Sequence, residues 1–317
     1  MNIDEATEVI CNGGVVAFPT ETVYGLGADA LNPEAIARVF KIKGRPSDNP
    51  LIIHLSDPEQ VALFSDDIPQ HAFTLMSAFW PGPLTLVFQK RDNVPDIATG
   101  GLPSVALRIP DHPTALELIR RTGPLVGPSA NPSGKPSPTR ARHVRNDFGD
   151  RVSVLDGGEC RIGLESTVLD MTSDPPRILR PGEISPEAIQ KIIGIKPAYT
   201  QSGGHSSPSP GVRYTHYKPD ASVAWYSSGT QTEWDKTLLI THQALQGSSS
   251  KIFARVVHYR GNYDLLAREL YDQFRTADKH GLKRILIEPF SSEIRHPIIA
   301  ALINRIEKAV ERDSSHD

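Results

Sequence analysis

Three basic side chains surround a tight turn in the stretch KIKGRPSDNPLIIHL, which runs from residue 41 to residue 55. Lys41, Lys43 and Arg45 stand beside the turn, and an apolar run that carries His54 follows directly. Cationic side chains next to exposed backbone N–H groups suit the oxygens of a phosphate. The alternative interpretation is a solvated helix end, where the helix dipole favours Lys and Arg.

Similar short polar stretches recur along the first part of the chain, each next to an apolar run. They are PTETVYG (19–25), PSVALRIP (103–110), GPSANPSGKPSPT (127–139), ESTVLD (165–170) and RILRPGE (177–183). Together they are rich in cations, hydroxyls and other hydrogen-bond donors, and poor in paired carboxylates. That inventory favours the binding and polarisation of phosphates over acid–base hydrolysis of sugars or peptides.

Arg108 interrupts the strand-like apolar run VALRIP. A buried guanidinium is costly unless an anion lies beside it. No carboxylate stands at a local spacing that would pair with Arg108, so we expect an anionic ligand there. A paired structural arginine is the alternative, and His54 has an equally structural interpretation as a core histidine.

Two familiar nucleotide motifs are present only in imperfect form. The glycines of GLGADA, from Gly25 to Ala30, fit a loose dinucleotide fingerprint, but PTETVY separates them from the preceding strand and we expect a Gly-rich turn. SGK at 133–135 resembles a Walker loop, yet the required upstream glycine is Ser129 and a proline follows the lysine. HExxH, CxxC and GxSxG patterns do not occur in the sequence.

Composition narrows the class of protein. The chain has 317 residues and a formal net charge of −3, so no global field draws it to nucleic acid or to a membrane. Cys11 and Cys160 lack disulfide or metal-ligand spacing, and we expect both to be buried thiols. The start is acidic and no segment approaches the ~20 apolar residues of a membrane helix, so we expect a cytoplasmic protein.

Strand-like and helix-like segments mix throughout the chain. Strands are expected at VVAF, LIIHL, LTLVFQK, VALRIP and PLV, and later at VAWYS, TLLIT, IFARVVHY and RILIEPF. Helices are expected between Asp4 and Gly13 and at PEAIARVFKIK, PEQVALF, HAFTLMSAF, PTALELIRRT, YDLLARELYDQFRTADK and HPIIAALINRIEKAV. Since no βα repeat of constant length appears, the sheet of the first part should be mixed.

The same pattern predicts three regions. We expect residues 1–195 to form an α/β domain, and residues 221–317 a second, smaller α/β domain. Between them, residues 196–220 are rich in Ser, Gly and Pro, which is typical of a linker. The end of this linker, SPGVRYTHYKP, contains aromatic and basic residues that a plain spacer rarely has.

The motifs of the first 170 residues resemble those of a known family. Six motifs, in this order and spacing, closely resemble those of the YrdC-like domain: PTETVYGLG, KGRPSDNPLIIHL, WPGPLTLVF, VALRIPDHP, GPLVGPSANPSGKPSPT and ESTVLD. SPGVRYTHYKP followed by a second domain is similar to the long form of the threonylcarbamoyl-AMP synthase family. The motifs cover about residues 8–220, and beyond them the resemblance rests on architecture. It implies a twisted, mixed YrdC-like sheet with flanking helices, plus a Rossmann-like C-terminal α/β domain.

The resemblance also implies a reaction. L-threonine, bicarbonate and ATP give threonylcarbamoyl-AMP and pyrophosphate, with Mg²⁺ as the expected metal and no protein ligand for it named by the sequence. The product would feed the tRNA threonylcarbamoyl-transfer machinery, which makes N6-threonylcarbamoyladenosine. Cations, hydrogen-bond donors and positioning would provide the catalysis, and no protein nucleophile is needed.

Site residues follow from the resemblance, position by position. The nucleotide side would comprise Lys43 and Arg45, which are also the expected catalytic residues, with Asn49, Ser104, Ser129, Asn131, Ser137 and Arg180. The L-threonine side would comprise Thr22, His54, Arg108 and one or both of Ser166 and Thr167, with Arg108 on the carboxylate. Tyr217, or His216 as second choice, would close over the nucleotide as the linker folds back.

Two rival functions remain at this stage. The first is an RNA-binding module that uses a concave basic surface of the YrdC-like domain, although aromatic residues make up only 7% of the chain. The second is a carbamoyl-transfer relative of the hydrogenase-maturation type, which would carry zinc-finger cysteine pairs that this sequence lacks. The sequence assigns no role to the C-terminal domain, no oligomeric state and no degree of preference for threonine over serine.

Overall fold

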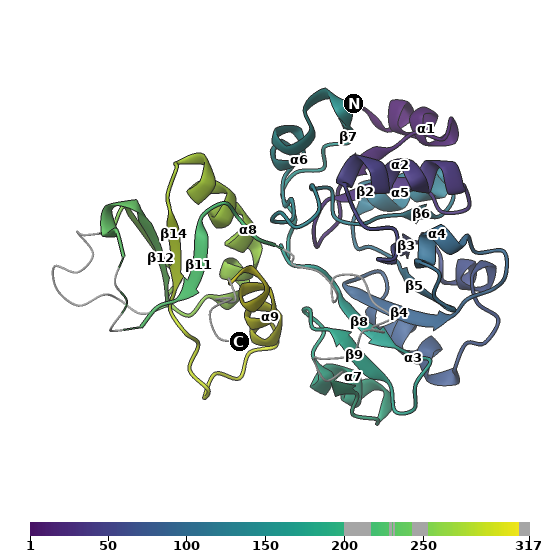
Figure 1. Cartoon of the computed structure of the whole chain (residues 1–317). Helices are drawn as coiled ribbons and strands as arrows, with labels where there is room; N and C mark the ends of the chain where they lie inside the picture. Colours follow the sequence, from purple (N-terminus) through teal and green to yellow (C-terminus); the bar gives the residue numbers. More distant parts are fainter. Residues whose placement is uncertain (200–216, 228–229, 231, 243–252, 311–317) are drawn as a thin grey trace, which may run out of the picture. The chain divides into compact units, whose positions relative to one another are not determined.

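The computed structural model describes residues 1–199, 217–227, 230, 232–242 and 253–310, and the chain divides into two compact units (Figure 1). The first unit comprises Met1–Ser133 and Ser137–Tyr214, and the second comprises Gly134–Pro136 and Thr215–Asp317. Most of the expected linker, residues 200–216, lies outside the described residues, and so does His216.

A mixed sheet runs through the first unit, as the sequence predicts. Among the described residues it has ten strands in the order β10-β9-β8-β4-β5-β3-β6-β2-β1-β7. The strands are β1 Val16–Phe18, β2 Gly25–Asp29, β3 Ile52–His54, β4 Leu84–Gln89, β5 Ser104–Arg108, β6 Leu125–Val126, β7 Ser153–Val154, β8 Thr167–Asp170, β9 Arg177–Arg180 and β10 Ala198–Tyr199. Parallel pairs such as β3–β5 and β4–β8 alternate with antiparallel pairs such as β4–β5.

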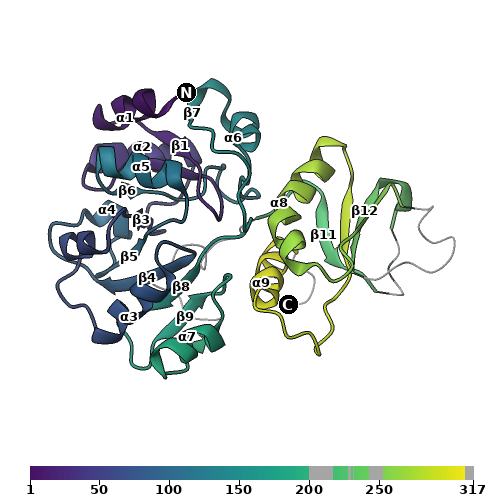
Figure 2. The same ribbon diagram turned by 180° about the vertical axis from the view of Figure 1, so that it is seen from behind.

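Helices cover both faces of this sheet (Figure 2). They are α1 Ile3–Cys11, α2 Pro33–Lys43, α3 Gln70–Phe79, α4 Asp96–Thr99, α5 Pro113–Thr122, α6 Ala141–Phe148 and α7 Pro186–Ile193, with short 3₁₀ helices at Pro58–Leu63 and Gly149–Arg151. Strand β1 shows the division: Val16 and Phe18 join the apolar cluster of α1 and α5, while Ala17 joins the cluster of α2 and α3. Alternate side chains of a strand point to opposite faces, so each face has its own core.

Helix α2 leads directly to the basic turn. Asn32 caps it by accepting from the N–H groups of Glu34 and Ala35, and Pro33 occupies its first turn. Gly44 ends it in a left-handed conformation with φ 60°, as the sequence predicts. The apolar face of α2 is buried, which fixes where the helix ends and therefore where Lys43 and Arg45 stand.

The segment expected to be a Gly-rich turn is strand β2, so that prediction is wrong. β2 pairs antiparallel with β1, and the ring of Phe18 packs against its two glycines. A Cβ on Gly25 or Gly27 would lie 2.9 Å from the Phe18 ring. The glycines therefore allow a close approach rather than a turn. The helix expected at PEQVALF is a 3₁₀ helix over Pro58–Leu63. The prediction that both cysteines are buried is wrong for Cys11, which is exposed, and confirmed for Cys160.

The second unit contains a separate parallel sheet. Its described strands are β11 Ser222–Trp225, β12 Thr237–Thr241, β13 Arg255–His258 and β14 Arg284–Ile287, in the order β11-β14-β12-β13. Helices α8 Tyr263–Lys279 and α9 Ile299–Ala309 accompany it, with a short 3₁₀ helix at Trp234–Lys236. Leu266, Leu270 and Phe274 of α8 are fully buried. The smaller Rossmann-like α/β domain is thus confirmed.

Candidate active site

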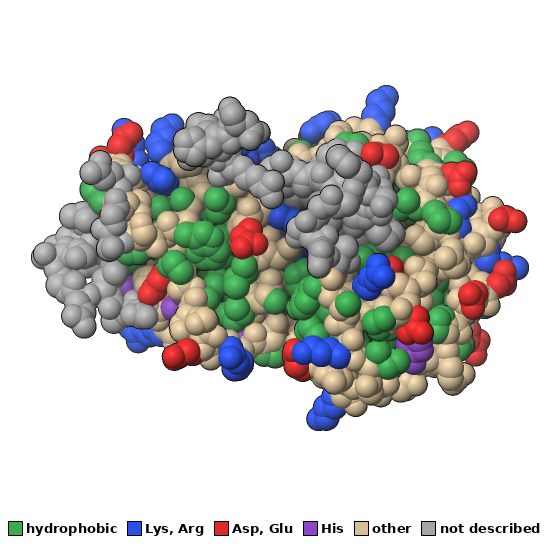
Figure 3. Space-filling model, turned by 60° about the horizontal axis from the view of Figure 1, so that its bottom comes forward, with side chains coloured by type: hydrophobic (Ala, Val, Ile, Leu, Met, Phe, Trp, Pro, Cys, Tyr) green, Lys and Arg blue, Asp and Glu red, His purple; other side chains and the backbone are tan. Residues whose placement is uncertain are grey.

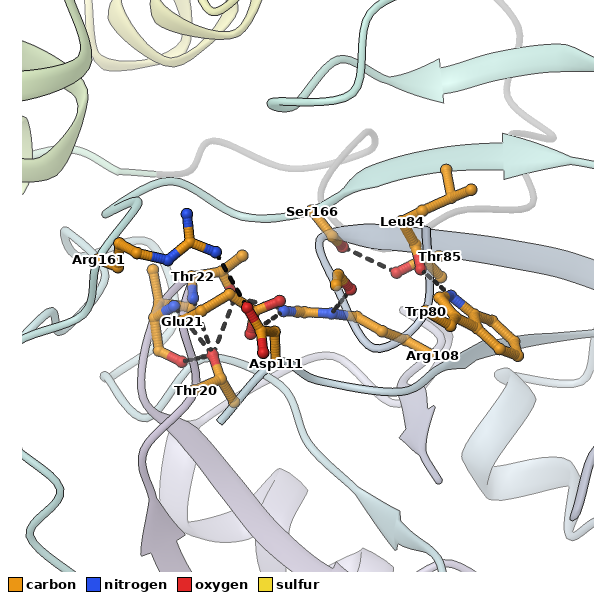
Figure 4. A network of polar contacts seen from close by, with 12 residues as sticks. Thr20, Glu21, Thr22, Trp80, Leu84, Thr85, Arg108, Asp111, Arg161 and Ser166 are labelled. Carbon is orange, nitrogen blue, oxygen red and sulfur yellow. Dashed lines mark hydrogen bonds and ion pairs between the residues drawn. The ribbon is translucent and has the colours of Figure 1, made fainter. Parts of the chain in front are cut away.

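Arg108 lies at the end of β5, directly across from His54 of β3 in the parallel register. Its side chain is 3% exposed and has three partners. Nε donates to the carbonyl of Gly82 at 3.1 Å, one terminal nitrogen donates to the hydroxyl of Thr22 at 2.9 Å, and the other lies 2.6 Å from a carboxylate oxygen of Glu21. Figure 4 shows the guanidinium pointing toward Glu21 and Thr22.

Glu21, which sequence reasoning missed, is a carboxylate partner of Arg108, so the expectation that only a ligand would supply the anion is wrong. Glu21 stands far from Arg108 along the chain, so no local spacing could reveal the pair. The Glu21 side chain is also buried, at 2% exposure. Its only signal in the sequence is its place within PTETVYG.

Two threonine hydroxyls fix the segment that carries Glu21. The Thr20 hydroxyl donates to the carbonyl of Val23 at 2.6 Å. It therefore accepts from the hydroxyl of Thr22, 2.9 Å away, and Thr22 in turn accepts from Arg108. This chain of donors leaves each hydroxyl proton assigned, which orients Thr22 toward Arg108.

His54 is buried and neutral. Its ring packs edge-on against Phe18, with centroids 5.6 Å apart, and its Nδ1 has no hydrogen-bond partner among the described residues. Burial, with the neighbouring charge of Arg108, lowers the pKa of His54 to about 3. A Cβ on Gly127 would lie 2.7 Å from Nδ1, so glycine keeps the space beside this nitrogen open.

Lys43 is not a solvated helix end, because its side chain is 3% exposed. Its ammonium group donates to the carbonyls of Ser129 and, at 2.6 Å, Asn131. Burial, with the positive charge of Arg45, lowers the pKa of Lys43 well below its ordinary value. An anion beside this group would offset both causes, so the site is suited to a phosphate.

Arg45 and Asn49 hold the turn that follows α2. Arg45 donates to the side-chain oxygen of Asn49 at 2.6 Å and to the carbonyls of Asn49 and Pro50. Asn49 is 1% exposed, and its side-chain nitrogen has no hydrogen-bond partner among the described residues. That nitrogen is a donor available to a ligand.

Hydroxyl groups of the remaining stretches are mostly buried and bonded. The hydroxyl of Ser137 donates to Glu165 at 2.6 Å, and that of Ser166 lies 2.8 Å from Thr85 and accepts from Arg180. Thr167 bonds the carbonyl and N–H of Ile184, which leaves its hydroxyl occupied. Ser104 is 8% exposed at the start of β5. Sequence reasoning missed Glu165 and Thr85, of which the first lies within ESTVLD.

Backbone hydrogen bonds bring these groups together. The carbonyls of Glu21 and Thr22 accept from the N–H groups of Ile162 and Gly163, at 2.8 and 3.1 Å. The N–H of Tyr24 donates to the carbonyl of Pro138, and the carbonyl of Tyr24 accepts from the N–H of Ala130. Both partners lie in the loop that holds Ser129, Asn131 and Ser137. The segment with Glu21 and Thr22 is therefore tied to the loop that surrounds Lys43.

Tyr217, the expected nucleotide contact from the end of the linker, belongs to the second unit. There its ring stacks on Tyr271 at 5.4 Å and the guanidinium of Arg305 lies 5.5 Å from the ring centroid. Its φ of 67° is in the left-handed region.

Neither a metal cluster nor a membrane helix is found among the described residues. Across that part of the chain, no group of three or more His, Cys, Asp or Glu could hold a metal ion. The helices described there are all too short or too polar to span a bilayer. On the face drawn in Figure 3, Lys and Arg side chains are interspersed with Asp and Glu, and the described residues form no continuous basic patch there.

Comparison with known proteins gives consistent results over nearly the full chain. A family model described as "Telomere recombination" matches residues 8–182, and one described as "Threonylcarbamoyl-AMP synthase, C-terminal domain" matches residues 184–310. The threonylcarbamoyl-AMP synthase of Pyrococcus abyssi is 43% identical over 96% of this chain and 92% of the relative. That of Bacillus subtilis is 40% identical over 97% of this chain and 92% of the relative.

A solved structure gives the same result. The crystal structure of P. abyssi Sua5 complexed with L-threonine is similar with a TM-score of 0.87 and 39% identity, over 97% of this chain and 93% of that one.

Proposed function

The chain belongs to the threonylcarbamoyl-AMP synthase family, and from this premise we propose how its own residues carry out the reaction. As a member it is a nucleotidyltransferase-type enzyme that uses ATP. Overall, L-threonine, bicarbonate and ATP give threonylcarbamoyl-AMP, pyrophosphate and water. We assign this chemistry to residues 1–195, with residues 196–220 as linker and 221–317 as an accessory domain.

L-threonine binds in the proposal at Arg108. Its carboxylate lies against the guanidinium, for which a planar fork of donors is suited. Thr22 holds that guanidinium in place, and the neutral His54 offers Nδ1 to the side-chain hydroxyl of the substrate. Ser166 and Thr167 both stay in the proposal, because the hydroxyl of Ser166 bonds Thr85 and Arg180 while that of Thr167 bonds the backbone of Ile184.

ATP binds at the basic turn and the loop behind it. Lys43 and Arg45 contact the phosphates, Asn49 offers its free amide nitrogen, and Ser104, Ser129, Asn131, Ser137 and Arg180 complete the nucleotide side. Tyr217 remains our proposal for a residue that contacts the nucleotide.

The amine of threonine and bicarbonate form a carbamate, and a carbamate oxygen attacks the α-phosphorus in line as pyrophosphate leaves. Negative charge builds on phosphate oxygens, where the cations of the site stabilise it.

Mg²⁺ enters the proposal as the counter-ion of the substrate ATP. Such an ion is bound through phosphates and water with only one or two protein carboxylates, so it needs no larger cluster. Glu165, buried beside Ser137, is the carboxylate that the nucleotide side offers. When bound, the ion would supply further neutralisation of phosphate charge.

Threonylcarbamoyl-AMP must be consumed by a transfer reaction, and we propose the tRNA threonylcarbamoyl-transfer machinery as the partner, in the cytoplasm. An RNA-binding role is not favoured by any feature of the site. One observation carries the proposal: a single unit buries two separate cations, Arg108 and Lys43, and the backbone bonds of Glu21, Thr22 and Tyr24 tie their surroundings together.

The two sides of the site are separable by experiment. Lys43→Ala should raise the KM for ATP by about 10-fold or more, since it removes a charged hydrogen bond, while the Kd of L-threonine measured without ATP stays unchanged. Lys41→Ala, two residues earlier and exposed, is the matched control and should change neither value. Equal weakening of ATP and threonine by Lys43→Ala would remove the assigned division of the site.

A further inference from the structure

A buried carboxylate without a hydrogen bond stands in the threonine side of the site. Both oxygens of Glu21 are shielded from solvent, and neither has a hydrogen-bond partner among the described residues. One of them lies 2.6 Å from Arg108, in an ion pair whose angle is not that of a hydrogen bond. Carboxylates buried in this way are normally hydrogen-bonded as well as paired, so Glu21 has acceptor capacity to spare.

The charges of the buried Glu21–Arg108 pair indicate which chemical group can bind beside it. Glu21 and Arg108 together form a neutral buried pair, and a carboxylate added alone on Arg108 would bring an uncompensated charge into a buried site. An α-amino acid enters as a zwitterion, with one carboxylate and one ammonium group. Laid along the pair, its carboxylate meets Arg108 and its ammonium meets Glu21, which keeps the site neutral.

We propose that Glu21 recognises the α-amino group of L-threonine and holds its nitrogen in the site. The inference rests on the proposed placement of the substrate carboxylate on Arg108. An ammonium group has three donors and no acceptor, which matches a carboxylate with free acceptor positions. Glu21 is thereby the residue that selects amino acids over hydroxy acids and positions the nitrogen that becomes carbamoylated.

The backbone of Glu21 is fixed before substrate arrives. Its carbonyl accepts from Ile162 at 2.8 Å, and the hydroxyl of Thr20 accepts from the N–H groups of Thr22 and Val23 at 3.2 Å. A carboxylate on such a held segment does not have to be ordered on binding, which lowers the entropic cost of recognition.

The first test needs no mutation. Binding to the intact protein without ATP is measured by calorimetry for L-threonine, for 2,3-dihydroxybutyrate of matching configuration, which replaces the amine by a hydroxyl, and for threoninol, which lacks the carboxylate. The proposal expects dihydroxybutyrate to bind at least about 10-fold more weakly than L-threonine, as for a lost charged hydrogen bond. Equal affinities for these two compounds would overturn it.

The second test separates recognition from a merely structural counter-ion. Glu21→Gln should weaken L-threonine by about 10- to 100-fold and leave dihydroxybutyrate unchanged or tighter, because only the first compound has an ammonium group. A counter-ion that only holds Arg108 would give equal weakening of both, which would contradict the proposal. Glu21→Asp keeps the charge and should retain part of the preference for the amine; loss of that preference would count against the proposal.

Controls distinguish failure of this inference from failure of the threonine placement. Glu117→Gln breaks an exposed Glu–Arg pair on α5 and should change no affinity. In Arg108→Ala, the preference for L-threonine over threoninol should disappear. If that preference persists, the carboxylate does not lie on Arg108 and the placement itself is wrong, whatever Glu21 does.

Discussion

Arg108→Ala removes a buried cation that has three partners, and its effect should fall on one substrate only. The proposed contact with the threonine carboxylate is a charged hydrogen bond from each of two nitrogens, and losing both should cost about 3 kcal/mol, which corresponds to about 150-fold in the KM for L-threonine. The KM for ATP should change little, since Lys43 is held by the carbonyls of Ser129 and Asn131. Arg108→Lys keeps the charge but can reach one of the three partners, so its effect should be intermediate.

The assay is the initial rate of pyrophosphate release, with L-threonine varied at saturating ATP and then ATP varied at saturating L-threonine. Stability must be followed in parallel, because the substitution leaves Glu21 buried without its cation, at a cost of about 3–5 kcal/mol. Thermal unfolding shows whether each variant is folded at the assay temperature. Equal rises in both KM values in a folded Arg108→Ala protein would refute the role assigned to this residue.

Three further predictions concern neighbours of Arg108. Because the pKa of His54 is lowered to about 3, the histidine is protonated at higher pH in the unfolded chain than in the folded one. The free energy of unfolding should therefore fall by up to about 5 kcal/mol as the pH falls from about 6.5 toward 3. His54→Gln should remove this pH dependence, which is measured by urea unfolding at several pH values. The same pH dependence of unfolding free energy in the wild type and in His54→Gln would contradict this prediction. Gly127→Ala places a Cβ 2.7 Å from His54 and should destabilise by about 1–3 kcal/mol while raising the threonine KM; an unchanged KM and melting temperature would show that the space is not needed. Thr22→Val leaves a donor of Arg108 without its acceptor and should cost about 1–3 kcal/mol in unfolding experiments, whereas Thr22→Ser keeps the hydroxyl and should be near wild type. A near-wild-type Thr22→Val beside a destabilised Thr22→Ser would show that the methyl group, not the hydroxyl, matters.

Local patterns predicted the parts of the fold that depend on local physics. Helix α2 begins at Pro33 and ends before Gly44, as capping rules require, and Arg108 and His54 were both singled out because polar residues within apolar runs need a reason. The mixed sheet followed from the irregular order of strands and helices.

Long-range contacts explain what the sequence could not provide. The glycines of β2 predict a turn by local rules, and only the packed ring of Phe18 shows why Gly25 and Gly27 stand in a strand. The partner of Arg108 was missed because Glu21 is close in space and distant in sequence. The sequence also allows Lys43 to be a solvated helix end, because the carbonyls to which it donates belong to a distant loop at residues 129–131.

The same contacts give the site its chemical character. A buried Lys with a lowered pKa, a neutral buried His and a carboxylate without hydrogen bonds are each unfavourable in an unliganded protein. In our proposal, a phosphate at Lys43, a substrate hydroxyl at His54 and an ammonium group at Glu21 relieve these costs. Perturbed groups of this kind cluster at functional sites because ligand binding relieves the perturbation.

Release of pyrophosphate from ATP by the intact protein is the most direct measurement, with L-threonine and bicarbonate each omitted in turn and L-serine used in place of L-threonine. We expect release only when both co-substrates are present, with L-serine a poorer substrate than L-threonine. Release that continues without L-threonine or without bicarbonate would contradict the proposed reaction.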